Sequence, residues 1–140
     1  MIIQKKVYEQ LLKFLPEYPP EMGGMLGGTD NVIKIIEFDY GQLEHLCGYE
    51  PDVHRLNAEI KVWLEKDIYF MGIFHTHFFG VKTLSEPDIE YIKQILNAMP
   101  EYISTLYFPI AVLPERKLIP YIAIRQKPDV LIKADKLIIQ

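Results

Sequence analysis

The segment that most constrains the fold is Ile68–His77, in which apolar and aromatic residues lead into two histidines. A short apolar run of this kind, rich in aromatic residues, predicts a buried strand. Patterns with helical spacing lie on both sides of it, and prolines end the first and the last of them. The expected helices are Gln4–Leu15, His54–Lys66 and Glu86–Met99. Further strands are expected at Glu21–Gly28, Val32–Tyr40, Ile103–Leu113, Leu118–Arg125 and Val130–Ile139.

Helices that alternate with strands, followed by a strand-rich end, indicate an α/β or α+β protein with a single mixed β-sheet flanked by helices. The 140 residues have the length of one domain, and a hydrophobic content of 49% supplies enough apolar mass for a core. This composition excludes a disordered or fibrous chain. We therefore expect one domain over residues 1–140.

Composition also limits the partners and the cellular setting. No apolar stretch is long enough to span a bilayer, and the first residues carry no secretory signal. The single cysteine, Cys47, has no second cysteine to pair with, which favours a reducing, cytoplasmic location. A net charge of −4 without any basic run argues against nucleic acid or a membrane surface as a partner.

The residues that can carry chemistry are concentrated around His75-Thr76-His77. Side chains at positions i and i+2 of a strand point to the same face, about 6–7 Å apart, so both imidazoles can reach one ion. Asp88, in the first turn of the expected helix, supplies a carboxylate that points back toward the end of the strand. Two imidazoles and one carboxylate leave one tetrahedral position open, which is typical of a catalytic zinc site.

Parts of this pattern have an ordinary structural explanation. Ser85-x-x-Asp88 before an apolar run is also a common helix N-cap. Paired imidazoles in an apolar strand are harder to explain, because each buried nitrogen needs a partner. With four loop lengths allowed, a pattern of this kind arises by chance in roughly three of ten thousand chains of this composition, and the frequent use of serine and aspartate in helix caps raises that figure about tenfold. Capping and ligation are compatible, since a cap would fix the orientation of Asp88.

The pattern His75-Thr-His77-x7-Ser85-x-x-Asp88 resembles the motif of the JAMM (JAB/MPN, Mov34-type) zinc metalloproteases. Upstream, Glu21-Met-Gly-Gly-Met-Leu-Gly-Gly fits that family's E-x-x-G-x-L-x-G at each position. The resemblance covers most of the chain and implies a JAB/MPN-like fold with a cytidine-deaminase-like core. It also implies one Zn²⁺ ion with a bound water, held by His75, His77 and Asp88 as the metal ligands. The catalytic residues that it implies are Glu21, which acts as acid and base, and Ser85, which acts as a hydrogen-bonding group.

The resemblance further implies hydrolysis of a peptide or isopeptide bond, commonly at the C-terminal tail of a ubiquitin-like or sulfur-carrier protein. Where the family usually has proline after the second histidine, this chain has Phe78, followed by Phe79, so the local shape of that loop is expected to differ. The short loop and minimal length resemble the compact prokaryotic members. An extended substrate tail close to the backbone of Glu21–Gly28 would explain the glycines of that strand.

Two other functions stay open at the level of sequence: a non-catalytic MPN-type scaffold that binds partners without metal, and a metallopeptidase that acts on small peptides. All the motif residues are present, which favours an enzyme over a scaffold. His45 and Cys47 also invite a thiol-protease interpretation, but no third group that would orient them is evident. The sequence assigns no oligomeric state.

Overall fold

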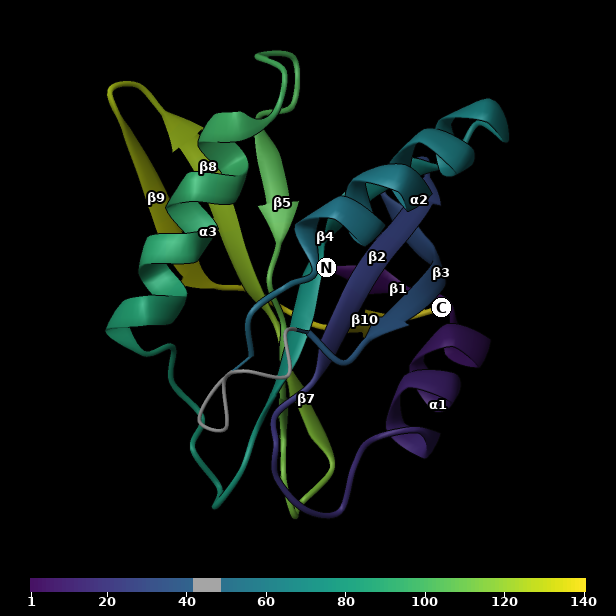
Figure 1. Ribbon diagram of the computed structural model, residues 1–140, viewed down its shortest axis with the longest axis vertical. Coiled ribbons are helices and arrows are strands. Elements are labelled where there is room, and N and C mark those ends of the chain that lie inside the picture. The colour runs from purple at the N-terminus through teal and green to yellow at the C-terminus, as the bar shows by residue number, and fades with distance from the viewer. Residues whose placement is uncertain (42–48) are drawn as a thin grey trace.

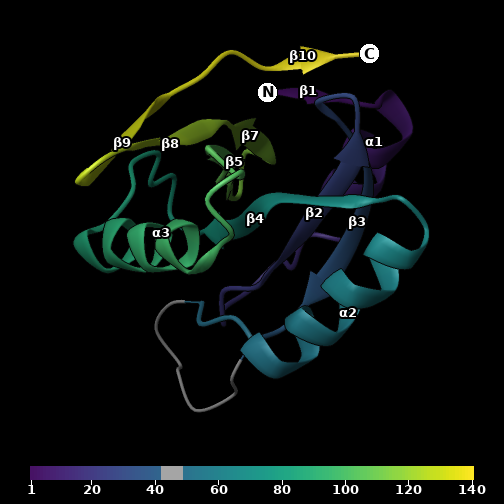
Figure 2. The same cartoon turned by 90° about the horizontal axis from the view of Figure 1, so that it is seen from above.

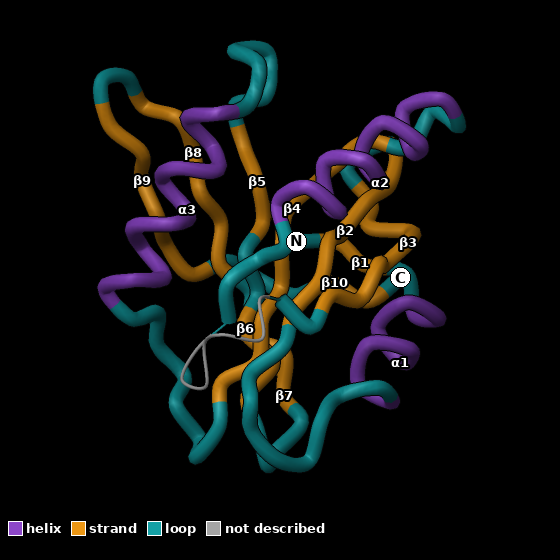
Figure 3. Tube along the Cα trace, viewed as in Figure 1, coloured by secondary structure: helices purple, strands orange, loops and turns teal. Residues whose placement is uncertain are grey.

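The structure is a computed structural model that describes residues 1–41 and 49–140. Its strands form one curled mixed sheet in the order β10-β1-β3-β2-β4-β5-β8-β9, while β6 pairs with both β4 and β7 (Figures 1 and 3). The strands are β1 (Ile2–Ile3), β2 (Gly23–Thr29), β3 (Val32–Asp39), β4 (Tyr69–His77), β5 (Thr105–Tyr107), β6 (Ile110–Val112), β7 (Lys117–Ile119), β8 (Tyr121–Gln126), β9 (Asp129–Ala134) and β10 (Ile138–Ile139). The helices are α1 (Lys5–Lys13), α2 (Val53–Glu65) and α3 (Glu86–Ala98). The mixed sheet flanked by helices that the sequence predicts is confirmed.

Strand β4 lies in the middle of the sheet, antiparallel to β2 on one side and parallel to β5 and β6 on the other. Its side chains alternate between two core clusters: Phe74 packs with residues of α1, and Ile73 packs with residues of α2 and α3. Figure 2 shows α2 and α3 on the same side of β4. Cover on both faces explains the nearly continuous apolar sequence of β4. His75 and His77 share the face of Ile73 and therefore point toward the side that α2 and α3 cover.

Three expected strands are interrupted in the structure. Ile103–Leu113 divides into β5 and β6 around Pro109, and the region of Leu118–Arg125 divides into β7 and β8 around Pro120. Proline has no N–H to donate to a strand ladder, which accounts for both breaks. The third, Val130–Ile139, divides into β9 and β10. The two-residue strand β1, which pairs with β3 and β10, is too short to carry a periodic signal.

The glycines of β2 are explained by the protein's own packing. A Cβ on Gly27 would lie 2.5 Å from the ring of Trp63, and a Cβ on Gly23 would lie 2.6 Å from the ring of Tyr49. Strand β2 is buried and hydrogen-bonded along both edges, to β3 and to β4. The expectation that a substrate tail runs along these glycines is therefore wrong, because buried aromatic rings and neighbouring strands occupy that space. Among the described residues, no helix is both long and apolar enough to cross a bilayer.

Candidate metal centre

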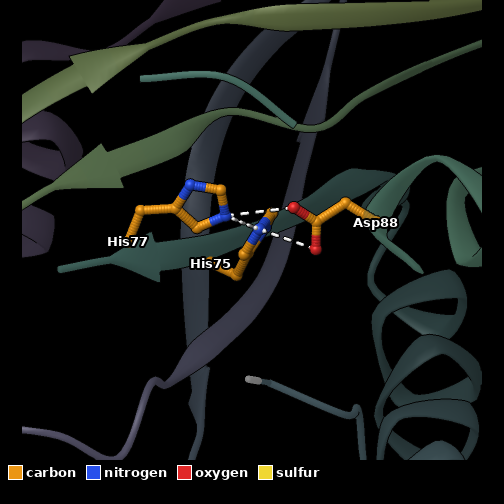
Figure 4. A group of neighbouring side chains, drawn as sticks. All are labelled: His75, His77 and Asp88. Carbon is orange, nitrogen blue, oxygen red and sulfur yellow. Dashed lines mark hydrogen bonds and ion pairs between the residues drawn. The ribbon is translucent and has the colours of Figure 1, made fainter. Parts of the chain in front are cut away.

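The end of β4 and the start of α3 bring three potential metal donors to one point (Figure 4). Nε2 of His75 lies 2.8 Å from Nε2 of His77. Asp88 places Oδ2 3.0 Å from Nε2 of His77 and Oδ1 3.3 Å from Nε2 of His75. All three residues are buried, and together they form a group that could bind a metal ion. These are the three residues that the sequence pattern singled out as ligands.

The donor set fits a cation on chemical grounds. Two neutral Nε2 lone pairs at 2.8 Å repel each other unless a proton or a cation lies between them. A tetrahedral ion with bonds of about 2.0–2.1 Å holds its donors about 3.3 Å apart. The separation between Nε2 of His75 and Oδ1 of Asp88 already has this value, whereas His77 faces the other oxygen, Oδ2. The other two separations are shorter by about 0.3 and 0.5 Å, which small side-chain rotations can supply.

Asp88 is held in place by the N-cap of α3. Ser85 is the N-cap residue, and its Oγ accepts the backbone N–H of Asp88 at 3.2 Å. In return, Oδ2 of Asp88 accepts the backbone N–H of Ser85 at 2.9 Å. The same carboxylate thus completes a capping box and faces both histidines, so its role in the helix cap is compatible with a role as a metal ligand. Negative charge is also favoured at this end of the helix.

Each histidine has a second partner at Nδ1. Nδ1 of His77 lies 3.3 Å from the carbonyl oxygen of Val81, and Nδ1 of His75 lies 3.1 Å from Oη of Tyr91. Sequence reasoning did not identify either partner. Tyr91 follows Asp88 by three residues in α3, and this spacing places both on one helix face, a signal that was available in the sequence. Val81 acts through its backbone carbonyl, which no side-chain pattern reveals.

Glu21 reaches the site through the pairing of β2 with β4. Gly23 stands opposite His75 in the antiparallel register. The pairing continues upstream, because the N–H of Met22 donates to Oγ1 of Thr76 at 2.9 Å and the N–H of Thr76 donates to the carbonyl of Met22 at 2.8 Å. Extending this register by one residue places Glu21 beside His77. Two segments more than fifty residues apart in sequence therefore meet at one end of the sheet.

The charges of these groups shift one another's pKa values. Burial raises the pKa of Glu21, and this effect outweighs the opposing influence of His75 and His77. Burial acts to raise the pKa of Asp88 as well, but hydrogen bonds with both histidines hold it well below its usual range. Burial lowers the pKa of His77, but its hydrogen bond with Asp88 and the nearby carboxylates raise it overall. Glu21 is thus the carboxylate of the site that most readily takes up a proton.

A groove of about 770 Å³ lies over this group of side chains. Its lining includes Glu21, His77, Ser85 and Asp88, and much of the remainder is apolar: Pro19, Pro51, Phe78, Phe79, Val81 and Pro87. After the second histidine the chain turns sharply. Phe78 is buried, whereas Phe79 has a φ of 59° and is 88% exposed at the groove. An apolar side chain in this exposed position is available to contact a bound molecule.

His45 and Cys47 lie outside the described residues, so the thiol-protease interpretation is not tested. His54 is exposed on α2. Within residues 1–41 and 49–140, the group formed by His75, His77 and Asp88 is the one with the spacing of a metal site.

Comparison with known proteins independently supports the assignment of the fold. No protein-family model matches the chain, and no curated protein matches its sequence. Among solved structures, protein DSY2949 from Desulfitobacterium hafniense has a TM-score of 0.70 and 19% identity, with 100% of this chain and 93% of that chain covered. AF2198, a JAB1/MPN domain protein from Archaeoglobus fulgidus, has a TM-score of 0.52 and 14% identity, with 99% and 98% covered. At these identities the likeness concerns the fold alone. The JAB/MPN-like fold implied by the motif is confirmed.

Proposed function

We propose that this protein is a zinc-dependent peptidase or isopeptidase of the JAMM type. The observation that carries the proposal is the convergence of His75, His77 and Asp88 at one point. His77 and Asp88 line one groove together with Glu21, and His75 lies buried behind them. The JAB1/MPN fold supports it. Zinc is the preferred ion because two imidazoles and one carboxylate, with one position left free, are typical of a catalytic zinc site.

An ion held by these three side chains would supply Lewis acidity, which makes water nucleophilic near neutral pH and polarises a carbonyl group. The chain's own residues would handle the protons. Glu21, with its raised pKa, accepts a proton from the attacking water and delivers it to the leaving nitrogen, so that the C–N bond breaks after the C–O bond forms. Ser85 uses one acceptor lone pair in the N-cap, which leaves its hydroxyl proton to donate to the substrate carbonyl oxygen.

The proposed substrate is the C-terminal tail of a ubiquitin-like or sulfur-carrier protein. A groove of about 770 Å³ with an exposed apolar residue at its edge suits an extended polypeptide segment. Its charged lining, apart from His77, consists of the carboxylates of Glu21, Glu50, Asp88 and Glu90, and neither lysine nor arginine occurs among the described lining residues. This favours a tail without acidic side chains and supports the exclusion of nucleic acid as a partner. A cytoplasmic location, suggested by the single cysteine, belongs to the same proposal.

Metal analysis of protein purified without added metal or chelator is the first test. We expect about one zinc per chain in the wild type and little in Asp88→Ala or His77→Ala, because each removes one of three protein ligands. Circular dichroism of the metal-free variants checks that they fold. A wild type that neither contains zinc nor takes it up on titration contradicts the enzyme and favours the scaffold function.

Cleavage assays then test Glu21. Glu21→Gln keeps the size of the side chain but accepts no proton, so we expect it to retain zinc and to cleave ubiquitin-like fusions about 10²–10⁴-fold more slowly. The matched control is Glu17→Gln, a substitution of an exposed glutamate that is not part of the groove lining. Wild-type cleavage by zinc-loaded E21Q would rule out the role assigned to Glu21.

A further inference from the structure

Two tyrosines pack against His75, and they contact it in different ways. The ring of Tyr49 is nearly parallel to the imidazole, with centroids 6.4 Å apart and an interplanar angle of 13°. The ring of Tyr91 meets it edge-on, with centroids 5.9 Å apart. The hydroxyl of Tyr49 donates to Oδ2 of Asp39 at 2.7 Å, whereas Oη of Tyr91 lies 3.1 Å from Nδ1 of His75. Of these two hydroxyl groups, the one that reaches the imidazole is therefore that of Tyr91.

Tyr91 is well fixed for such a role. It lies on α3 three residues after Asp88, and its ring packs edge-on against the buried Phe108, with centroids 6.2 Å apart. One helix thus provides both the carboxylate of the site and the partner of His75. Any movement of α3 shifts these two groups together, so the position of the histidine is tied to that of the aspartate.

The chemistry of imidazole determines what the hydroxyl must do when a metal is bound. Nε2 of His75 faces His77 and Asp88, so Nε2 is its ligating nitrogen. A neutral imidazole that ligates through Nε2 carries its proton on Nδ1, which then needs an acceptor. Among the described residues, Oη of Tyr91 is the hydrogen-bond partner of that nitrogen. The carbonyl of Val81 stands in the equivalent position for His77.

We propose that Tyr91 is a positioning residue of the metal centre: its hydroxyl accepts the Nδ1–H of His75 and holds the imidazole with Nε2 directed at the ion. This inference rests on the metal site of the proposed function and goes beyond its ligand set. Partners of this kind orient the ring and fix its tautomer, and their loss typically lowers metal affinity about 10–100-fold. Tyr91 contributes nothing to the ligand count, so its effect is on affinity and geometry.

Tyr91→Phe and Tyr49→Phe form a matched pair for the test. Both remove one hydroxyl from a ring in contact with His75, but Tyr49→Phe leaves the partner of Nδ1 in place. We expect the zinc affinity of Y91F, measured by competition with a chromophoric chelator at pH 7.5, to fall about 10–100-fold. We expect that of Y49F to stay near the wild-type value. Thermal unfolding of the metal-free proteins establishes that both variants are folded.

Imidazole NMR of the zinc-loaded proteins supplies a readout that a loss of packing would not produce. We expect a slowly exchanging Nδ1–H resonance for His75 in the wild type and in Y49F, and its loss or rapid exchange in Y91F. Wild-type affinity together with a protected Nδ1–H in Y91F would overturn the inference, and so would equal losses of affinity in both variants. A wild type that binds no zinc contradicts the proposed function itself, whereas normal zinc binding by Y91F contradicts only the role of Tyr91.

Discussion

Replacing Ser85 with alanine removes a hydroxyl that has two separable roles: the N-cap of α3 and the proposed donor to the substrate carbonyl. In the cap, Oγ of Ser85 accepts the N–H of Asp88 at 3.2 Å. Loss of such a cap typically lowers the free energy of unfolding by about 1 kcal/mol. Since the unfolding entropy of a 140-residue chain is about 0.3 kcal/mol/K, the Tm of metal-free S85A should fall by about 3 °C.

Ser85→Asn separates the two roles, because asparagine caps helices about as well as serine but has no hydroxyl group. We expect S85N to recover the wild-type Tm while its kcat stays about 10²–10³-fold below that of the wild type, the usual effect of losing one donor to a developing oxyanion. Ser85→Thr keeps both the hydroxyl and the cap and is the matched control. Calorimetry of the metal-free proteins and cleavage of a ubiquitin-like fusion by the zinc-loaded proteins measure the two effects.

Two results would refute this reasoning. An unchanged Tm in S85A would mean that the hydrogen bond between Ser85 and Asp88 contributes nothing to the stability of α3. Wild-type kcat in S85A, which has no side-chain donor at this position, would mean that the hydroxyl acts only as a cap, and the donor role would have to be withdrawn. A variant S85A that also loses zinc would extend the role of the cap, because it would show that the capping box holds Asp88 in position for the ion.

Three further results are expected. Zinc affinity should fall as the pH is lowered, because the ion competes with a proton for His77, whose pKa is raised above its ordinary value by Asp88 and Glu21 despite burial. Equal affinities by calorimetry at pH 6, 7 and 8 would contradict this. Gly27→Ala should lower the free energy of unfolding, measured by urea denaturation, by about 1–3 kcal/mol, because the added Cβ clashes with Trp63. In a Trp63→Leu background the same substitution should cost clearly less. Equal losses in both backgrounds would exclude that contact as the cause. Phe79→Gly should leave the Tm nearly unchanged, because relief of the positive φ in the folded state offsets the added conformational freedom of the unfolded chain. It should nevertheless raise KM for a protein substrate. An unchanged KM would mean that Phe79 does not contact the substrate.

Local patterns in the sequence were sufficient for the elements with strong periodicity. The boundaries of α1, α2, α3 and β4 lie within two residues of the ranges that spacing and flanking prolines predict. The strand-rich end was less well determined, because Pro109 and Pro120 interrupt apolar runs that otherwise look continuous. Where a proline stands inside such a run, only the positions of the neighbouring strands determine whether the strand bends, breaks or lies at an edge.

The glycines of β2 illustrate the same limit. The sequence indicates that something approaches this strand closely, but not what does so. The tertiary structure supplies Trp63 from α2 at Gly27, and Tyr49 at Gly23, in place of a substrate. Close packing involves residues far apart in the chain, so a single sequence cannot identify the neighbour.

The candidate ligand group could be predicted from the sequence because its geometry is local. His75 and His77 share a strand face by the two-residue period, and Ser85 and Asp88 share a helix start, which orients the carboxylate. What brings Glu21 beside them is the register of β2 against β4, a long-range property fixed by the whole sheet. The partners at Nδ1 likewise depend on how α3 and the loop after β4 pack. The sequence by itself determined which side chains can ligate, since that follows from residue type and short spacing. Only the tertiary structure decided which groups surround them, because contacts between distant segments arise from the packing of the complete chain.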